Sequence, residues 1–103
     1  MNTILCDAIG ARRLLRFIYD GYERVVEPHQ YGINTANHEM LSCWLVGGWS
    51  RSETEPGWRN YLVRDMYDIH ALAESFVGPR AGYNAEDAAF RQVYCRLEPP
   101  PTA

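Results

Sequence analysis

An Asp-Gly dipeptide between two apolar runs places the strongest constraint on how this chain can fold. Asp20 and Gly21 separate the run 14–19 from the run 22–28, and both runs are rich in aliphatic and aromatic residues. Asp-Gly suits a two-residue hairpin turn because both central residues need positive φ angles, which Gly adopts freely and Asp tolerates. We therefore predict that the two runs form an antiparallel β-hairpin.

Further segments of β type follow this hairpin along the chain. Residues 38–47 and 58–64 form a second pair of predicted strands, and residues 66–72 offer one more. Side chains that face a core and side chains that face solvent alternate along a strand with a period of two. The sequence thus predicts a small, strongly bent antiparallel barrel of SH3/Sm-like type, whose core spans about residues 14–72.

Helices are expected at both ends of this barrel. Asn2 or Thr3 can cap a first helix over residues 3–13, where apolar residues recur at helical spacing. Asn84 is a good N-cap for a second helix over about 84–97. Its apolar face would carry Phe90, Val93, Tyr94 and Leu97. The predicted fold class is therefore mainly β (α+β), in a single domain over residues 1–103.

Charge and cysteine usage limit the classes of function. The formal net charge is -3 and all ten basic residues are Arg, so the chain lacks a general basic footprint for nucleic acid. Cys6, Cys43 and Cys95 are widely spaced and match no zinc-binding pattern, so we expect buried, reduced thiols in a reducing cytoplasm. No stretch resembles a signal peptide or a membrane span. We predict a cytoplasmic protein with no membrane contact and no cofactor.

Neither a metal site nor a catalytic nucleophile stands out. His29, His38 and Glu39 share no predicted face, and their spacing is a weak signal for metal ligands. Cys43 lies within a predicted strand, with no His at a diagnostic offset. The serines of the loop 50–57 lack a glycine elbow. We therefore expect that the chain is not an enzyme and holds no metal.

The hairpin and the strands after it resemble the WYL domain, a small barrel related to the SH3 and Sm folds. The matching pieces are Leu15-Arg16-Phe17-Ile18-Tyr19, Arg24-Val25-Val26-Glu27-Pro28 and the strands at 40–46 and 58–63. Their order and spacing fit the family over roughly residues 4–72. The strand of the Trp-Tyr-Leu tripeptide reads Met-Leu-Ser-Cys-Trp-Leu here. Asp65 and Met66 stand where the family has Arg-Ile.

The resemblance implies a regulatory function. WYL domains are usually joined to a DNA-binding helix-turn-helix in bacterial transcription regulators, and they are regarded as sensors of a nucleotide or nucleic-acid fragment. The thirteen residues before Leu14 are too few for a helix-turn-helix. The resemblance thus implies a stand-alone, non-enzymatic sensor that binds an anionic ligand.

Arginine and aromatic residues on the predicted strands form the candidate site. An anionic ligand of this kind needs forked donors for its phosphates and an aromatic face for its base. The predicted ligand-binding residues are Arg24, Arg59, Tyr61, Arg64, Trp44 and Tyr31, with Arg16 nearby. Arg59 and Tyr61 share one face of their strand because the side-chain period is two. The alternative is that these arginines are solvated and paired with carboxylates such as Glu23, Glu27 and Glu39, which would stabilise the fold little.

A protein-interaction or oligomerisation module, for example a homodimer, is the second hypothesis, and a small enzyme is the third. A sensor should bring Arg24, Arg59 and Arg64 together in one concavity, whereas an interaction module should expose a contiguous apolar patch. Trp49 and Trp58 bracket the loop 50–57. They would either pair across the base of a hairpin or form an exposed aromatic patch.

Overall fold

The structure is a computed structural model that describes residues 1–48 and 55–99. Its elements are α1 (Thr3–Ala11), β1 (Arg13–Tyr19), β2 (Tyr22–Asn34), β3 (Glu39–Gly48), β4 (Gly57–Leu62), the 3-10 helix η1 (Val63–Asp65), β5 (Tyr67–Ser75) and β6 (Phe90–Arg96). The strand pairs within this part of the chain are antiparallel. The prediction of a mainly β fold is confirmed.

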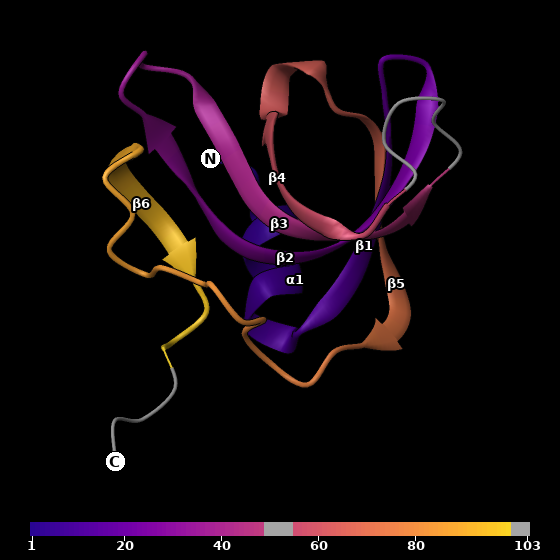
Figure 1. Cartoon of the computed structure of the whole chain (residues 1–103). Helices are drawn as coiled ribbons and strands as arrows, with labels where there is room; N and C mark the ends of the chain where they lie inside the picture. The colour runs from indigo at the N-terminus through magenta and orange to yellow at the C-terminus, as the bar shows by residue number, and fades with distance from the viewer. Residues whose placement is uncertain (49–54, 100–103) are drawn as a thin grey trace.

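The strands form one bent sheet in the order β4-β3-β2-β1-β5. Figure 1 shows how strongly this sheet curls: β2 and β3 sweep across the middle of the view, β4 rises above them, and β5 runs down the right-hand side. β2 is 13 residues long and changes register against β3 between Val25 and Val26 and between Pro28 and Gln30. Such shifts bend a strand and increase its twist. β2 can therefore pair with β1 through its first half and with β6 through its second half.

The two local predictions at the start of the chain are confirmed. Asp20 and Gly21 have φ angles of 52° and 79°, and Tyr19 pairs with Tyr22 across the turn. The Asn2 side chain caps α1 by accepting a hydrogen bond from the Ile4 amide at 2.9 Å. Both features depend on neighbours in sequence, so the local pattern was sufficient to predict them.

The predicted C-terminal helix is wrong. The side chains of Asn84 and Asp87 accept hydrogen bonds from backbone amides two residues ahead, which favours turns over a helix. The chain then enters β6, which pairs with β2. Gly32 permits this close approach, because a Cβ there would lie 2.9 Å from the Val93 Cα. Pairing with a strand that is remote in sequence thus overrode a helical pattern of apolar residues.

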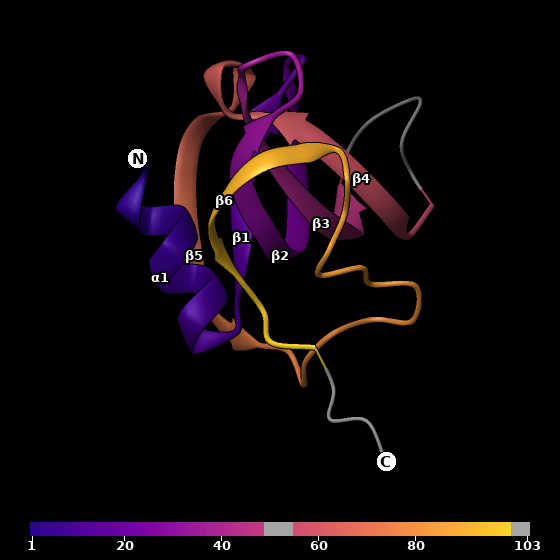
Figure 2. The same cartoon turned by 90° about the vertical axis from the view of Figure 1, so that its left-hand side faces the viewer.

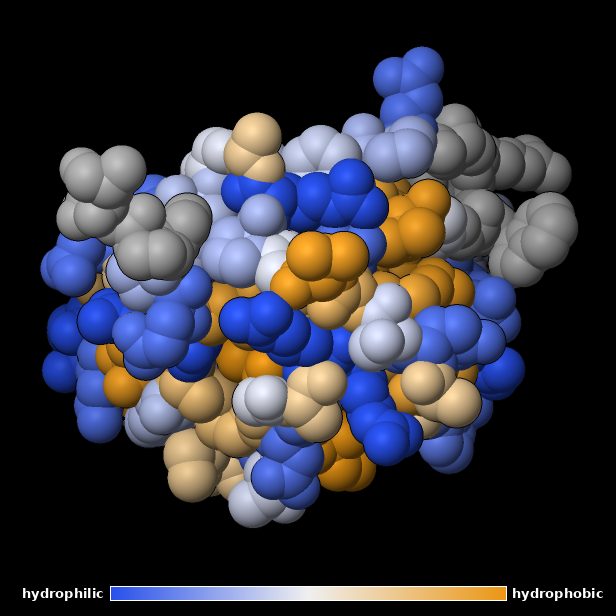
Figure 3. All heavy atoms as spheres, turned by 90° about the horizontal axis from the view of Figure 1, so that it is seen from below, coloured by the Kyte–Doolittle hydropathy of each residue, from blue (hydrophilic) through white to orange (hydrophobic). Residues whose placement is uncertain are grey.

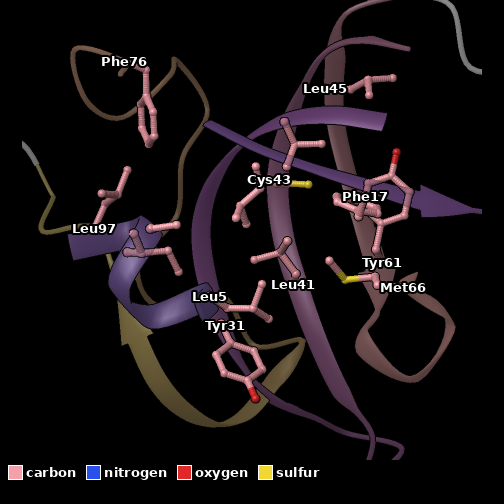
Figure 4. Close-up of a cluster of buried hydrophobic side chains, with 14 residues drawn as sticks. Leu5, Phe17, Tyr31, Leu41, Cys43, Leu45, Tyr61, Met66, Phe76 and Leu97 are labelled. Carbon is pink, nitrogen blue, oxygen red and sulfur yellow. The ribbon is translucent and has the colours of Figure 1, made fainter. Parts of the chain in front are cut away.

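The core lies inside the curl of the sheet. Figure 4 shows Leu5 of α1 together with Leu41 and Cys43 of β3 among the buried side chains. The full cluster comprises Leu5, Ala8, Ile9, Leu15, Phe17, Val26, Tyr31, Leu41, Cys43, Leu45, Tyr61, Met66, Phe76 and Leu97. Helix α1 runs along the side of the sheet close to β6 (Figure 2). Its buried face therefore covers one open side of the core.

A disulfide joins α1 to β6. It links Cys6 and Cys95, whose Cα atoms lie 5.7 Å apart. The expectation of reduced thiols is therefore wrong for these two residues, because β6 brings Cys95 against the helix. Cys43 keeps its thiol, which contacts the Arg59 carbonyl oxygen at 3.6 Å.

No helix in the described part of the chain is long and apolar enough to cross a membrane. The cytoplasmic location stays a prediction.

Candidate functional site

Two of the predicted aromatic residues belong to the core. Tyr31 is 0% exposed and Tyr61 is 2% exposed. The Tyr31 hydroxyl donates to the Glu39 carboxylate and accepts a hydrogen bond from the Asn2 amide at 2.8 Å. Tyr61 packs edge-on against Phe17 with ring centroids 5.1 Å apart. Neither ring therefore offers an exposed face to a ligand in this structure, and their assignment as ligand-binding residues stays a prediction.

The three predicted arginines do not meet in one concavity. Arg24 is buried and lies opposite Gly48, at the end of β3. Arg64 is exposed, and its Nη1 lies 3.5 Å from the Nδ1 atom of His38, just before the start of β3. The length of β3 between these points is roughly 30 Å of extended chain. Arg59 lies between them, on the core-facing side of β4, opposite Cys43.

The guanidinium of Arg59 serves the local backbone. Its Nη1 donates to the Trp58 carbonyl at 2.9 Å and its Nη2 donates to the Glu55 carbonyl at 3.0 Å. The alternative hypothesis, in which the arginines pair with carboxylates, holds for Arg16, whose Nε lies 3.4 Å from the Glu23 carboxylate. The predicted set of arginines is thus distributed over the fold.

Trp44 is the predicted site residue that marks a surface cluster. Glu27, Trp44 and Trp58 lie directly opposite one another on β2, β3 and β4. The two indoles pack edge-on at 5.6 Å, and the guanidinium carbon of Arg80 lies 5.1 Å from the Trp44 ring centroid. Trp58 therefore pairs with Trp44. The expected partner, Trp49, lies outside the described residues.

Arg80 is the residue that the sequence reasoning missed. Its Nε and Nη2 each donate to one oxygen of Glu27 at 2.8 Å, which is the bidentate geometry that suits a guanidinium and a carboxylate. The Glu27 side chain is 8% exposed, whereas the Arg80 side chain is 46% exposed. The hydrogen bonds with Glu27 raise the pKa of Arg80. The pair is separated by 53 residues in sequence, so only the fold brings it together.

His29 supports the loop that carries Arg80. Its Nε2 accepts a hydrogen bond from the Arg80 amide at 3.1 Å, so the proton resides on Nδ1, which donates to the Glu27 carbonyl at 2.8 Å. The ring stacks on Phe76 with centroids 5.7 Å apart. Burial lowers the pKa of His29. A neutral imidazole thus holds the backbone of the loop in place.

A pocket opens beside the Glu27–Arg80 pair. Its volume is about 510 Å³, and it is lined by Glu27, Ser75, Phe76, Val77, Gly78, Pro79 and Arg80. Phe76, Val77 and Pro79 give it an apolar wall. Nη1 of Arg80 has no hydrogen-bond partner among the described residues. The pocket thus combines a fixed cation with an apolar wall.

The underside of the molecule shows no dominant apolar surface. In Figure 3, hydrophobic areas are separated by hydrophilic residues over this face. A broad apolar patch, as expected for an interaction module, is therefore absent from the described residues on this face.

No protein-family model, curated protein or solved structure matches the chain. The resemblance to the WYL domain stays a prediction that rests on the residues quoted for it.

Proposed function

We propose that this chain is a non-enzymatic, WYL-like regulatory module that binds an anionic ligand, such as a nucleotide or nucleic-acid fragment, in the pocket beside Arg80. One observation carries the proposal. A guanidinium fixed by a carboxylate lies at the edge of a pocket of about 510 Å³, a size typical of small-molecule sites.

The arrangement of the strands supports an SH3/Sm-like barrel for this module. The order β4-β3-β2-β1-β5 follows the chain as a bent meander, with β5 returning beside β1. Helix α1 packs against both β1 and β5. These features agree with the barrel that the WYL resemblance implies, and β6 is an addition to it.

Glu27 prepares Arg80 for anion recognition. It occupies Nε and Nη2 and so fixes the plane of the guanidinium, while the N–H groups of Nη1 stay available. Guanidinium N–H groups match phosphate and carboxylate oxygens. Because Glu27 neutralises part of the positive charge, we expect recognition of one oxyanion group and modest affinity. Phe76, Val77 and Pro79 would contact the base or another apolar part of the ligand.

A variant at the pocket wall tests the proposal without disturbing the core. Val77 is 95% exposed, so Val77→Asp should leave the fold intact and place a negative charge in the pocket. Binding of nucleoside monophosphates, followed by tryptophan fluorescence, should weaken at least 10-fold, whereas the neutral control Val77→Asn should bind nearly as the wild type does. Absence of wild-type binding at millimolar ligand, or equal binding by both variants, would refute the function.

An interaction module is the second candidate, and the edge of the sheet favours it. β5 pairs with β1 on one side and forms the end of the strand order. Most of its side chains are exposed, including Tyr67. An open edge strand is a template for strand addition by a partner or a second copy. Light scattering across a concentration series tests self-association, and a strict monomer counts against a homodimer.

A further inference from the structure

The loop that forms the pocket is held at its first end by helix α1. We call residues 76–83 the pocket loop. The Phe76 amide donates to the Arg12 carbonyl at 2.9 Å, and Nη1 of Arg12 donates to the Val77 carbonyl at 2.6 Å. Arg12 is the C-cap residue of α1 and has a left-handed conformation. The position of this helix end therefore fixes the start of the pocket loop.

The other end of the pocket loop is held by the segment that leaves β6. The Tyr83 hydroxyl donates to the Leu97 carbonyl at 2.7 Å. The Leu97 amide in turn donates to the His29 carbonyl at 2.8 Å. Leu97 directly follows the last residue of β6, so the position of that strand fixes the end of the pocket loop.

The Cys6–Cys95 disulfide links these two anchors covalently. Cys6 lies in α1, six residues before Arg12, and Cys95 lies in β6, two residues before Leu97. Both cysteines are only partly buried, so a small reductant can reach them. The ladder between β6 and β2 has register shifts at two points. An interrupted ladder leaves fewer hydrogen bonds to hold β6 once the covalent link is broken.

We propose that this disulfide is a redox control on the pocket: reduction releases β6 from α1, loosens the pocket loop and weakens ligand binding. The proposal rests on the proposed function of the pocket. The reductant is a dithiol. One of its thiolates attacks a protein sulfur to give a mixed disulfide, and its second thiolate displaces the protein thiolate. Cys6 and Cys95 gain two electrons and two protons, and the dithiol becomes a cyclic disulfide.

Amide hydrogen exchange tests the structural part of the proposal. With dithiothreitol as the reductant, the Phe76 and Tyr83 amides, which lie at the two anchored ends of the pocket loop, should exchange at least 10-fold faster than in the oxidised protein. Amides of the β2–β3 ladder should accelerate by a much smaller factor. The variant Cys6→Ser/Cys95→Ser should behave like the reduced protein and should not respond to dithiothreitol. Equal acceleration of the pocket loop and the ladder, or no acceleration, overturns the proposal.

Ligand binding tests the regulatory part with the same samples. A nucleoside monophosphate should bind the reduced protein at least 5-fold more weakly than the oxidised protein. If neither form binds it while exchange is selective for the pocket loop, the proposed function fails and the redox control of the loop stands. If both forms bind equally, the redox control fails and the proposed function stands. Should the reduced chain unfold, sucrose is added to stabilise it. If the reduced chain also unfolds in sucrose, the disulfide stabilises the whole fold rather than the pocket loop, and the proposal is overturned.

Discussion

The pair formed by Glu27 and Arg80 gives the sharpest test of the energetics. Replacing Arg80 with Gln removes two charge-assisted hydrogen bonds of 2.8 Å and leaves the carboxylate of Glu27, whose side chain is 8% exposed, without its partner. Such bonds contribute about 1.5–3 kcal/mol each when they are buried. The Arg80 side chain is 46% exposed, so solvent screening reduces this contribution by roughly half. The contact with Trp44 adds about 0.5–1 kcal/mol.

We therefore expect Arg80→Gln to lower the free energy of unfolding by about 2–4 kcal/mol. Urea unfolding at pH 7 of Arg80→Gln, Glu27→Gln and the double variant measures the coupling between the two side chains. The expected coupling is that of the two screened hydrogen bonds, about 1.5–3 kcal/mol. The matched control is Arg16→Gln, because Arg16 makes a single contact of 3.4 Å with Glu23, whose side chain is 29% exposed, and this pair should contribute less than about 0.5 kcal/mol. A Glu27–Arg80 coupling no larger than that control would refute the reasoning.

Three further predictions follow from burial and packing. Burial lowers the pKa of His29 below its ordinary 6.5, so the unfolded chain binds a proton more readily than the folded chain as the pH falls. The free energy of unfolding should therefore drop between pH 7.5 and 5.5 by more in the wild type than in His29→Gln. Gly32→Ala should lower the melting temperature by several degrees, because the added Cβ would meet the backbone of β6. The control Gly47→Ala has open space around it and should leave the melting temperature unchanged, so equal melting temperatures of the two variants would contradict the packing. Burial raises the pKa of Tyr31 and Tyr83 to about 12, so an absorbance titration should show a tyrosine ionisation step at high pH whose amplitude is smaller in Tyr83→Phe. The free energy of unfolding should fall as the pH rises from 10 to 12, because these tyrosines ionise more readily in the unfolded chain.

The sequence by itself determined the features that depend on residues close together in the chain. The turn at Asp20-Gly21 follows from the φ angles that these residues accept, and the start of α1 follows from the Asn2 cap. The strand period also predicted that Arg59 and Tyr61 share a face. In each case the interacting groups are at most a few residues apart, so no knowledge of the fold is required.

The tertiary structure decided which face of each strand meets the core. Tyr61 lies opposite Leu41, and Arg59 lies opposite Cys43, both of which point into the core. The face that looked suitable for a ligand is therefore the inner face. Strand periodicity fixes which residues share a face, but only the neighbouring strands and α1 determine which face is covered.

Contacts between remote segments likewise came only from the fold. Glu27 and Arg80 are 53 residues apart, and the cysteines of the disulfide are separated by 89 residues. Residues 90–96 carry a pattern compatible with a helix, yet they form a strand because β2 extends past β1 and offers an edge. The hydrogen bonds gained at that edge outweigh a local preference, since intrinsic propensities differ by only about 1 kcal/mol per residue.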